Sequence, residues 1–238
     1  MTYNKAPIIE ASIDLRVILP ERTDLSKVNK LIKNDYPREE AIDNNTTTIR
    51  LEKQHTTVST AHQNIGYKLS AADGKFIAQI KNNGFTFNIL ENYKNWEDFH
   101  AEANRIWKIY CEELAPIRVS RVALRYINRI DIPASKFNLE EYFNTYPHVF
   151  KNNTADLSAL FMQVQIPQSE GGIAILNQTA TNPPSPGYTS ILLDIDVFDL
   201  KNFKPNDKEL WERIELLRKQ KNIIFEESIT DKTRELFS

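Results

Sequence analysis

The stretch LIKNDYP, at residues 31–37, closes a short apolar segment with Tyr-Pro, and YFNTYP, at residues 142–147, closes a second one in the same way about 110 residues later. Two further landmarks recur in the same order and at nearly the same offset: ILP at 18–20 with DIP at 131–133, and NWE at 95–97 with LWE at 210–212. A recurring order of landmarks predicts a tandem repeat of one supersecondary unit. We therefore expect two repeats, over residues 1–116 and 117–238, that pack together as one unit.

The first repeat begins with a strand and a short helix. From Ile8 to Leu19 apolar and polar residues alternate, and Pro20 ends the run. Such alternation is typical of a strand that is buried on one face. Residues 25–32 then repeat apolar side chains at helical spacing, and Pro37 prevents this helix from continuing.

Further strands and a long helix complete the first repeat. Strands are expected at residues 46–53, 66–70, 76–81 and 85–90. The polar run at 54–64 is interpreted as a loop. Asn83-Gly84 is a strong hairpin signal, and Asn95 is a good N-cap for a helix whose apolar face extends to Leu114.

The second repeat presents the same elements in the same order. We expect strands at 118–133, 157–166, 172–178 and 190–198, a short helix at 139–146, and a long helix from Asp207. Each repeat then has the layout β-α-β-β-β(-β)-α. This predicts an α+β protein in which one antiparallel sheet is covered on one face by two long helices. That layout is similar to the TATA-binding-protein and helix-grip folds.

The strand predicted at residues 119–133 carries the main candidate site for a partner or a phosphate group. Arg121, Arg125, Arg129 and Asp131 fall on its polar face. Arginines four residues apart on a strand are separated by about 13 Å, at ~3.3 Å per residue. The sequence therefore predicts a stripe of positive charge along this strand.

Three interpretations of the stripe remain open. Its guanidinium groups could bind phosphates or nucleic acid, or they could bind the carboxylates of an acidic protein partner. They could instead form cross-strand ion pairs within the sheet, because four acidic residues fall on the polar faces of other predicted strands: Glu10, Asp14, Asp194 and Asp196. Asn128 lies on the apolar face, which predicts either a hydrogen-bonded core amide or a buried polar pocket.

Asp194 and Asp196 form a second candidate site. Two carboxylates separated by one residue share a face of a strand and could hold a magnesium ion. The six glycines are dispersed, so neither a Walker nor a Rossmann phosphate loop is present, and there is no Gly-x-Ser-x-Gly nucleophile motif. We expect no catalytic residue and no cofactor, with metal- or nucleotide-dependent catalysis through this pair as an alternative.

The last residues form a third candidate site. Thr230 is a good N-cap for a final helical turn, and Leu236 and Phe237 are apolar. This predicts a segment that docks onto its own chain, or an apolar plug for another one.

Composition narrows the class of protein. The net charge of −2 provides no global attraction to nucleic acid or to an anionic membrane. With one cysteine, Cys111, the chain can form neither an intrachain disulfide nor a cysteine zinc cluster. No apolar run has the roughly 18 residues of a membrane span, so we expect a cytoplasmic protein that does not associate with membranes. The oligomeric state is open.

Two segments resemble a known family. RYINRI, at residues 125–130, and FEESITD, at residues 225–231, resemble the most specific parts of a bacterial family of sporadically distributed proteins of unknown function, and the similarity extends over nearly the whole chain. The resemblance supplies no activity and no catalytic residue. It implies a patchy distribution, which fits genes carried on mobile or antiviral defence islands.

These features together favour a non-enzymatic binding protein. We expect a sensor, subunit or inhibitor whose partner is another protein, encoded in the same defence or mobile-element operon. Direct binding of nucleic acid by the polar sheet face is the alternative of a different class.

Overall fold

The computed structural model describes residues 3–51, 56–90, 93–147 and 159–238. Its strands are β1 (Ile8–Ile18), β2 (Arg38–Leu51), β3 (Thr56–Ser70), β4 (Phe76–Lys81), β5 (Gly84–Leu90), β6 (Arg118–Ile132), β7 (Phe161–Pro167), β8 (Ile173–Thr181) and β9 (Thr189–Asp199). Its helices are α1 (Ser26–Ile32), α2 (Trp96–Leu114), α3 (Leu139–Tyr142), α4 (Lys208–Ser228) and α5 (Asp231–Glu235).

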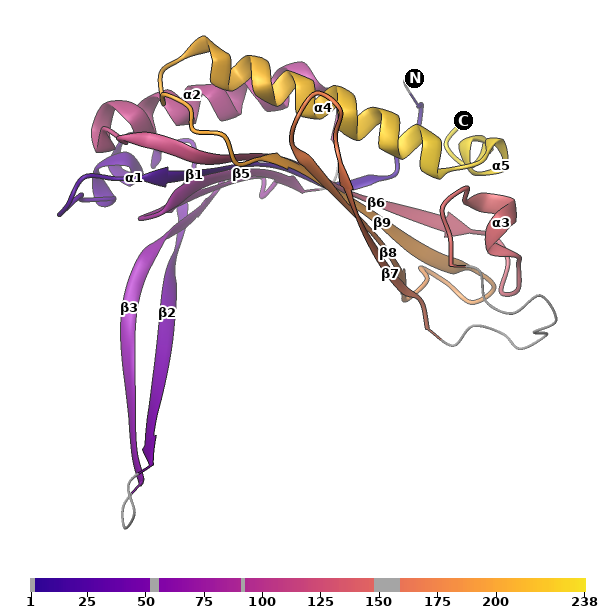
Figure 1. Ribbon diagram of the computed structural model, residues 1–238, viewed down its shortest axis with the longest axis horizontal. Coiled ribbons are helices and arrows are strands. Elements are labelled where there is room, and N and C mark those ends of the chain that lie inside the picture. Colours follow the sequence, from indigo (N-terminus) through magenta and orange to yellow (C-terminus); the bar gives the residue numbers. More distant parts are fainter. Residues whose placement is uncertain (1–2, 52–55, 91–92, 148–158) are drawn as a thin grey trace.

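The described strands form one antiparallel sheet, in the order β2-β3-β4-β5-β1-β6-β9-β8-β7. β1 and β6 pair at its centre, with Ile13 opposite Leu124. The strands that follow β1 in the chain lie on one side of this pair, and those that follow β6 lie on the other. The sheet is curved, and its concave side faces away from the two long helices (Figure 1). The α+β class and the covering of one face by long helices are thus confirmed.

The two long helices bury the apolar face of the sheet. α2 contacts β5, and α4 contacts β6 and β9. Aromatic rings fill the space beneath α2, where the centroids of Phe85 and Trp107 are 5.6 Å apart and those of Phe87 and Phe99 are 5.7 Å apart. The alternation in β1 therefore has its expected cause, because one face of that strand packs against this core.

Local signals fix the ends of α2. The side chain of Asn95 accepts a hydrogen bond from the backbone N–H of Asp98, as an N-cap should. Ala115 has a left-handed backbone, with φ 46°, and its N–H donates to the carbonyl of Cys111. Pro116 follows, so the helix cannot continue. The expected hairpin is also present, because only Asn82 and Asn83 separate β4 from β5.

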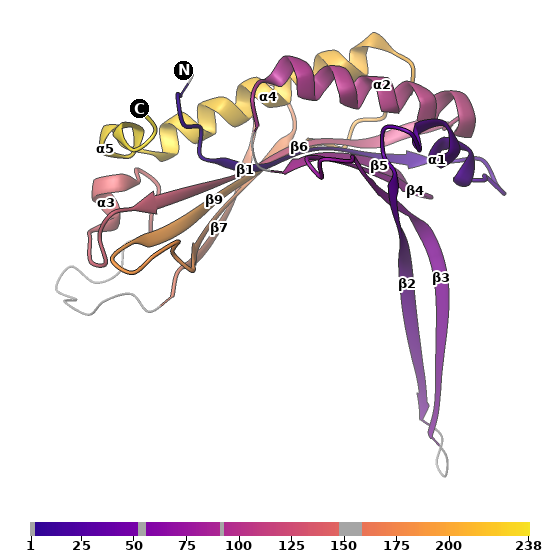
Figure 2. The same ribbon diagram turned by 180° about the vertical axis from the view of Figure 1, so that it is seen from behind.

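The predicted loop at 54–64 is wrong for residues 56–64, which belong to β3, and residues 54–55 lie outside the described part of the chain. β2 also begins at Arg38 rather than at 46. Beyond a bulge next to Ile42, the two strands continue as a two-stranded ribbon that leaves the sheet on the side opposite the helices (Figures 1 and 2). We call residues 43–51 and 56–64 the arm. Residues 46–51 of the arm lie within the strand expected at 46–53, whereas residues 56–64 have no apolar face, so periodicity gave no signal for them.

In the second repeat the predicted strands are found with shifted ends. β7 begins at Phe161, whereas 157 was expected, and residues 157–158 are outside the described part of the chain. The short helix α3 ends at Tyr142 rather than at 146. Among the described residues, no helix is both long and apolar enough to cross a membrane.

Candidate functional site: the uncovered polar face

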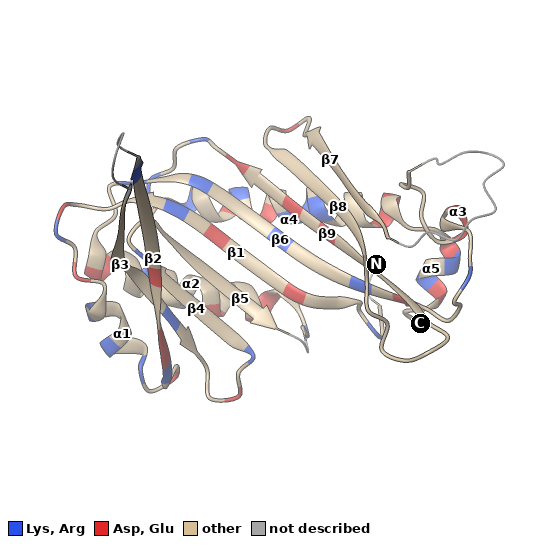
Figure 3. Cartoon of the chain, turned by 90° about the horizontal axis from the view of Figure 1, so that it is seen from below, with Lys and Arg blue, Asp and Glu red and all other residues tan. Residues whose placement is uncertain are grey.

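Strand β6 places the predicted arginines on the face of the sheet that no helix covers. Leu124 and Tyr126 point into the core and are 0% and 1% exposed. Arg121, Arg125 and Arg129 alternate with them and therefore lie on the opposite face. Figure 3 views this face, on which basic and acidic positions of β1, β6 and β9 lie next to one another. We call it the uncovered face.

The first polar ladder crosses five strands of the uncovered face. Lys81 Nζ donates to Thr86 Oγ1 at 2.7 Å, and Thr86 Oγ1 donates to Asp14 Oδ2 at 2.7 Å. Arg121 then bridges two carboxylates, with Nη1 2.8 Å from Asp14 Oδ1 and Nη2 2.9 Å from Asp196 Oδ2. All five side chains are joined, so the position of each depends on its neighbours.

A second ladder runs from β6 to the edge strand β7. Arg125 forms a bidentate pair with Asp194, through Nε at 2.7 Å and Nη2 at 2.8 Å. Asp194 also accepts from Asn177 Nδ2 at 3.0 Å, and Asn177 Oδ1 accepts from Gln163 Nε2 at 2.7 Å. This ladder extends the polar surface across the second half of the sheet.

A third, shorter ladder links β4, β5 and β1. Gln79 Nε2 donates to Asn88 Oδ1 at 3.3 Å, and Asn88 Nδ2 donates to Glu10 Oε1 at 2.8 Å. The first and third ladders both start on β4, and the second starts on β6, so ordered polar groups extend over this face from β4 to β7.

Arg129 and Asp131 form a separate cluster at the far end of β6. Arg129 Nε lies 2.9 Å from Asp131 Oδ1, and Arg129 Nη2 donates to the carbonyl of Asn182 at 2.9 Å. The hydroxyl of Ser190 donates to the same oxygen of Asp131. Both candidate residues are therefore engaged within the chain.

The arrangement makes the uncovered face close to neutral rather than basic. Arg121 and Arg125 lie against Asp14, Asp194 and Asp196, so their charges are largely compensated. The pKa of Arg125 is raised, chiefly by its hydrogen bonds to Asp194. The pKa of Asp196 is raised as well, because burial outweighs the attraction of the two arginines.

The structure therefore contains the cross-strand ion pairs that were one of the three interpretations of the arginine stripe. Asp14, Asp194 and Asp196 accept from the arginines, whereas Glu10 accepts from Asn88 instead. A phosphate or a partner carboxylate would have to compete with these pairs.

Asp194 and Asp196 do lie on one face of β9, as predicted. Each carboxylate, however, accepts from a different guanidinium, and no third acidic or histidine ligand in the described part of the chain joins them in a cluster of metal-binding type. A magnesium ion would have to displace both arginines, and metal binding here stays a hypothesis.

The C-terminal residues pack onto the chain itself. Phe237 is 4% exposed, and its ring lies edge-on to that of Tyr3, with centroids 5.4 Å apart. Leu236 is partly buried against the same core. Thr230 caps the last helix by accepting from the N–H of Thr233. This geometry matches a docking segment.

Sequence reasoning missed a buried lysine on the side of α4 that faces the sheet. Lys221 is 7% exposed, and its Nζ lies 3.8 Å from the centroid of the Tyr126 ring. Burial lowers the pKa of this amine to about 7. The spacing from Ile214 and Leu217 places Lys221 in the buried stripe of the helix, and this signal could have identified it. Asn128, also buried, donates to the carbonyl of Leu193 at 3.1 Å, as expected of a core amide.

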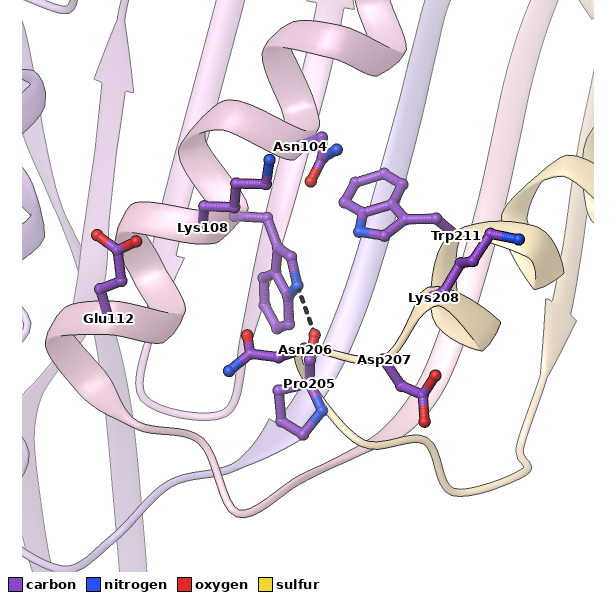
Figure 4. A pocket seen from close by; sticks show the side chains of 9 residues that line it. Asn104, Lys108, Glu112, Pro205, Asn206, Asp207, Lys208 and Trp211 are labelled. Carbon is purple, nitrogen blue, oxygen red and sulfur yellow. Dashed lines mark hydrogen bonds between the residues drawn. The ribbon is translucent and has the colours of Figure 1, made fainter.

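A groove of about 440 Å³ opens on the helix side, between α2 and the start of α4 (Figure 4). Trp107 is one of the residues that line it, and it donates from Nε1 to the carbonyl of Pro205 at 3.0 Å. Lys108, Lys208 and Asp207 lie at its rim. Its polar groups do not converge on one point, so the groove is not the strongest candidate site.

No protein-family model matches the chain, and no curated protein is similar to it in sequence.

Proposed function

We propose that this chain is a non-enzymatic binding protein that contacts a partner macromolecule through the uncovered face. One observation carries this proposal: the helices bury one face of a large sheet, while the other, which no described helix covers, holds three polar ladders. A rigid, pre-ordered polar surface loses little conformational freedom when it binds.

Another protein is the preferred partner. Nucleic acid binding depends on uncompensated positive charge, because the release of counterions supplies much of the affinity. On the uncovered face, Arg121 and Arg125 are compensated by carboxylates. Hydrogen-bonding groups and partly exposed ion pairs are, in contrast, common at protein interfaces.

We further propose that the chain is a tandem duplication with the layout of the TATA-binding-protein or helix-grip folds. The support is the element order, in which β1 and β6 are each followed by a short helix, antiparallel strands and a long helix. In both of those folds a curved sheet presents a binding face opposite its helices. This argument is by analogy of fold.

The resemblance of residues 125–130 and 225–231 to a sporadically distributed bacterial family supplies the setting. We propose an accessory subunit, sensor or inhibitor in the cytoplasm, whose partner is encoded in the same defence or mobile-element operon.

Affinity capture of the tagged protein from its native cells, at modest salt, tests the proposal. The comparison is between wild type, Arg125→Ala and Lys219→Ala. Arg125 lies in the second ladder and is half exposed, whereas Lys219 is exposed on α4, on the other side of the sheet. We expect one protein to be captured in stoichiometric amount by wild type and by Lys219→Ala, and to be lost with Arg125→Ala.

Two outcomes would overturn the proposal. Capture of nucleic acid alone, released by salt, would replace it with the nucleic acid alternative. A protein partner whose capture is unchanged by Arg125→Ala and reduced by Lys219→Ala would place the interface on the helices.

A further inference from the structure

The arm is long, is ordered into two strands, and extends away from the rest of the sheet. Its pairing extends from Asp43 opposite Asn64 to Leu51 opposite Thr56. Every side chain at 43–50 and 57–64 is exposed, including Ile49 and Val58, each 61% exposed and directly opposite one another. No described side chain of the arm is therefore buried.

Energetics make such a ribbon unfavourable in isolation. Ordering one residue of backbone costs about 1–2 kcal/mol, and a two-stranded hairpin is only marginally stable in water. β3 pairs with β4 only from Gly66 to Ser70, so in the arm the outer edge of β3 has no strand beside it. The N–H and C=O groups along that edge are free to pair with another strand.

The same edge lacks the features that normally prevent strand addition. Exposed edges are usually protected by charged residues, by proline or by bulges. Residues 57–64 of β3, TVSTAHQN, contain no Asp, Glu, Lys, Arg or Pro. The outer edge of β2 is also unpaired, but within the arm this strand carries two charged residues, Asp43 and Arg50. The unprotected edge of the arm is therefore that of β3.

We propose that the arm of a second copy of this chain covers this edge, so that two β3 strands pair antiparallel and join two arms into a four-stranded sheet. The edge of β3 is self-complementary, which favours a second copy as its partner. A two-fold axis at Thr60 places Thr60 opposite Thr60, Ser59 opposite Ala61 and Val58 opposite His62, and no charge meets a like charge. Isologous two-fold pairing also closes the assembly, as in most homo-oligomers.

Mass measurement by light scattering, from micromolar to 0.1 millimolar protein, tests the proposal. We expect wild type to be a dimer. Thr60→Lys sets two like charges opposite each other at the axis and is expected to give a monomer with an unchanged circular dichroism spectrum. Gln165→Lys is the matched control, since it places the same charge on the edge strand β7, and we expect it to remain a dimer.

Cysteine cross-linking identifies the edge. Opposed residues on antiparallel strands have Cα atoms about 4.5–5.5 Å apart, which suits a disulfide. We expect Thr60→Cys to form a covalent dimer on mild oxidation. Thr47→Cys, its neighbour on the other strand of the arm, should not. The native Cys111 is buried, and its pKa is raised to about 12, so it does not compete.

Several results would overturn the inference. They are a wild-type monomer at 0.1 millimolar, a dimer that Thr60→Lys leaves intact, assembly lost with Gln165→Lys, open-ended polymers, or a cross-link through Thr47→Cys in place of Thr60→Cys.

Discussion

Strand β6 presents Leu124 and Tyr126 to the helices and Arg121 and Arg125 to the uncovered face, one residue apart along the same backbone. On the covered side, the sheet is stabilised by close packing of apolar groups against α2 and α4. On the uncovered side, ion pairs and amide hydrogen bonds connect the side chains instead of apolar packing. The comparison teaches that one strand can serve stability on one face while leaving the other available for binding.

The largest difference between the faces is expected for truncation of a core residue. Leu124→Ala removes a fully buried side chain and leaves a cavity, which should lower the free energy of unfolding by about 2–5 kcal/mol. Urea denaturation measures this value. Gln165→Ala, at an exposed position of β7, is the control and should change it by less than about 0.5 kcal/mol. Equal effects of the two changes would contradict the assignment of the faces.

Lys221 is a buried amine on the otherwise mainly apolar covered side, and its removal tests the difference between the two faces. A lysine whose folded pKa is lowered to about 7 destabilises the protein while it is charged. Stability from this group is present above the unfolded pKa and is lost as the pH falls toward 7.

Lys221→Met should therefore stabilise the protein, by roughly 2 kcal/mol more at pH 7 than at pH 9. Urea denaturation of wild type and variant at pH 7 and pH 9 measures this difference. The titration of other groups affects both proteins equally and therefore cancels. If Lys221→Met changed the free energy of unfolding equally at the two pH values, the pKa of Lys221 would not be lowered in the folded protein.

Arg121→Ala tests the uncovered face and should have the smallest effect. It leaves Asp14 and Asp196 without their shared partner, but both carboxylates retain some contact with water. We expect the free energy of unfolding, measured by urea denaturation, to fall by about 1–2 kcal/mol.

The pH dependence of this loss follows from Asp196. Removing Arg121 should raise the pKa of Asp196 further above its ordinary value. The favourable contribution of a carboxyl with a raised folded pKa is present at low pH and is lost as the pH rises. The deficit of Arg121→Ala should therefore be larger at pH 7 than at pH 4. Adding Asp14→Asn and Asp196→Asn should restore part of the stability, and a deficit independent of pH would contradict the role of these carboxylates.

Local patterns predicted those parts of the fold that bury one face of an element. Strand β1 followed from alternation, α2 from its N-cap and apolar stripe, and the β4–β5 hairpin from Asn-Gly. Residues 46–51 of the arm were expected as a strand, but residues 56–64 were not, because an exposed polar strand has no buried face and hence no alternation to detect. The burial of Lys221 was not predicted, because only apolar residues were counted in the buried stripe of that helix.

The residues of the candidate site could be predicted from the sequence, but the ion pairs between them could not. The acidic residues were correctly placed on polar strand faces. Which of them meets which arginine depends on β1 and β9 flanking β6, and on the register that sets Arg125 opposite Asp196. Neither the strand order nor the register is encoded in a local pattern.

The central pairing of β1 with β6 has a consequence for synthesis of the chain. β1 is made first, and its partner β5 follows within the same half, but its other neighbour begins only at Arg118. A nascent chain that ends near Leu114 can form β1 to β5 while one edge of β1 is still open. Until β6 emerges from the ribosome, that edge, with Ala11, Ile13 and Leu15 beside it, is the part of the molecule most exposed to aggregation.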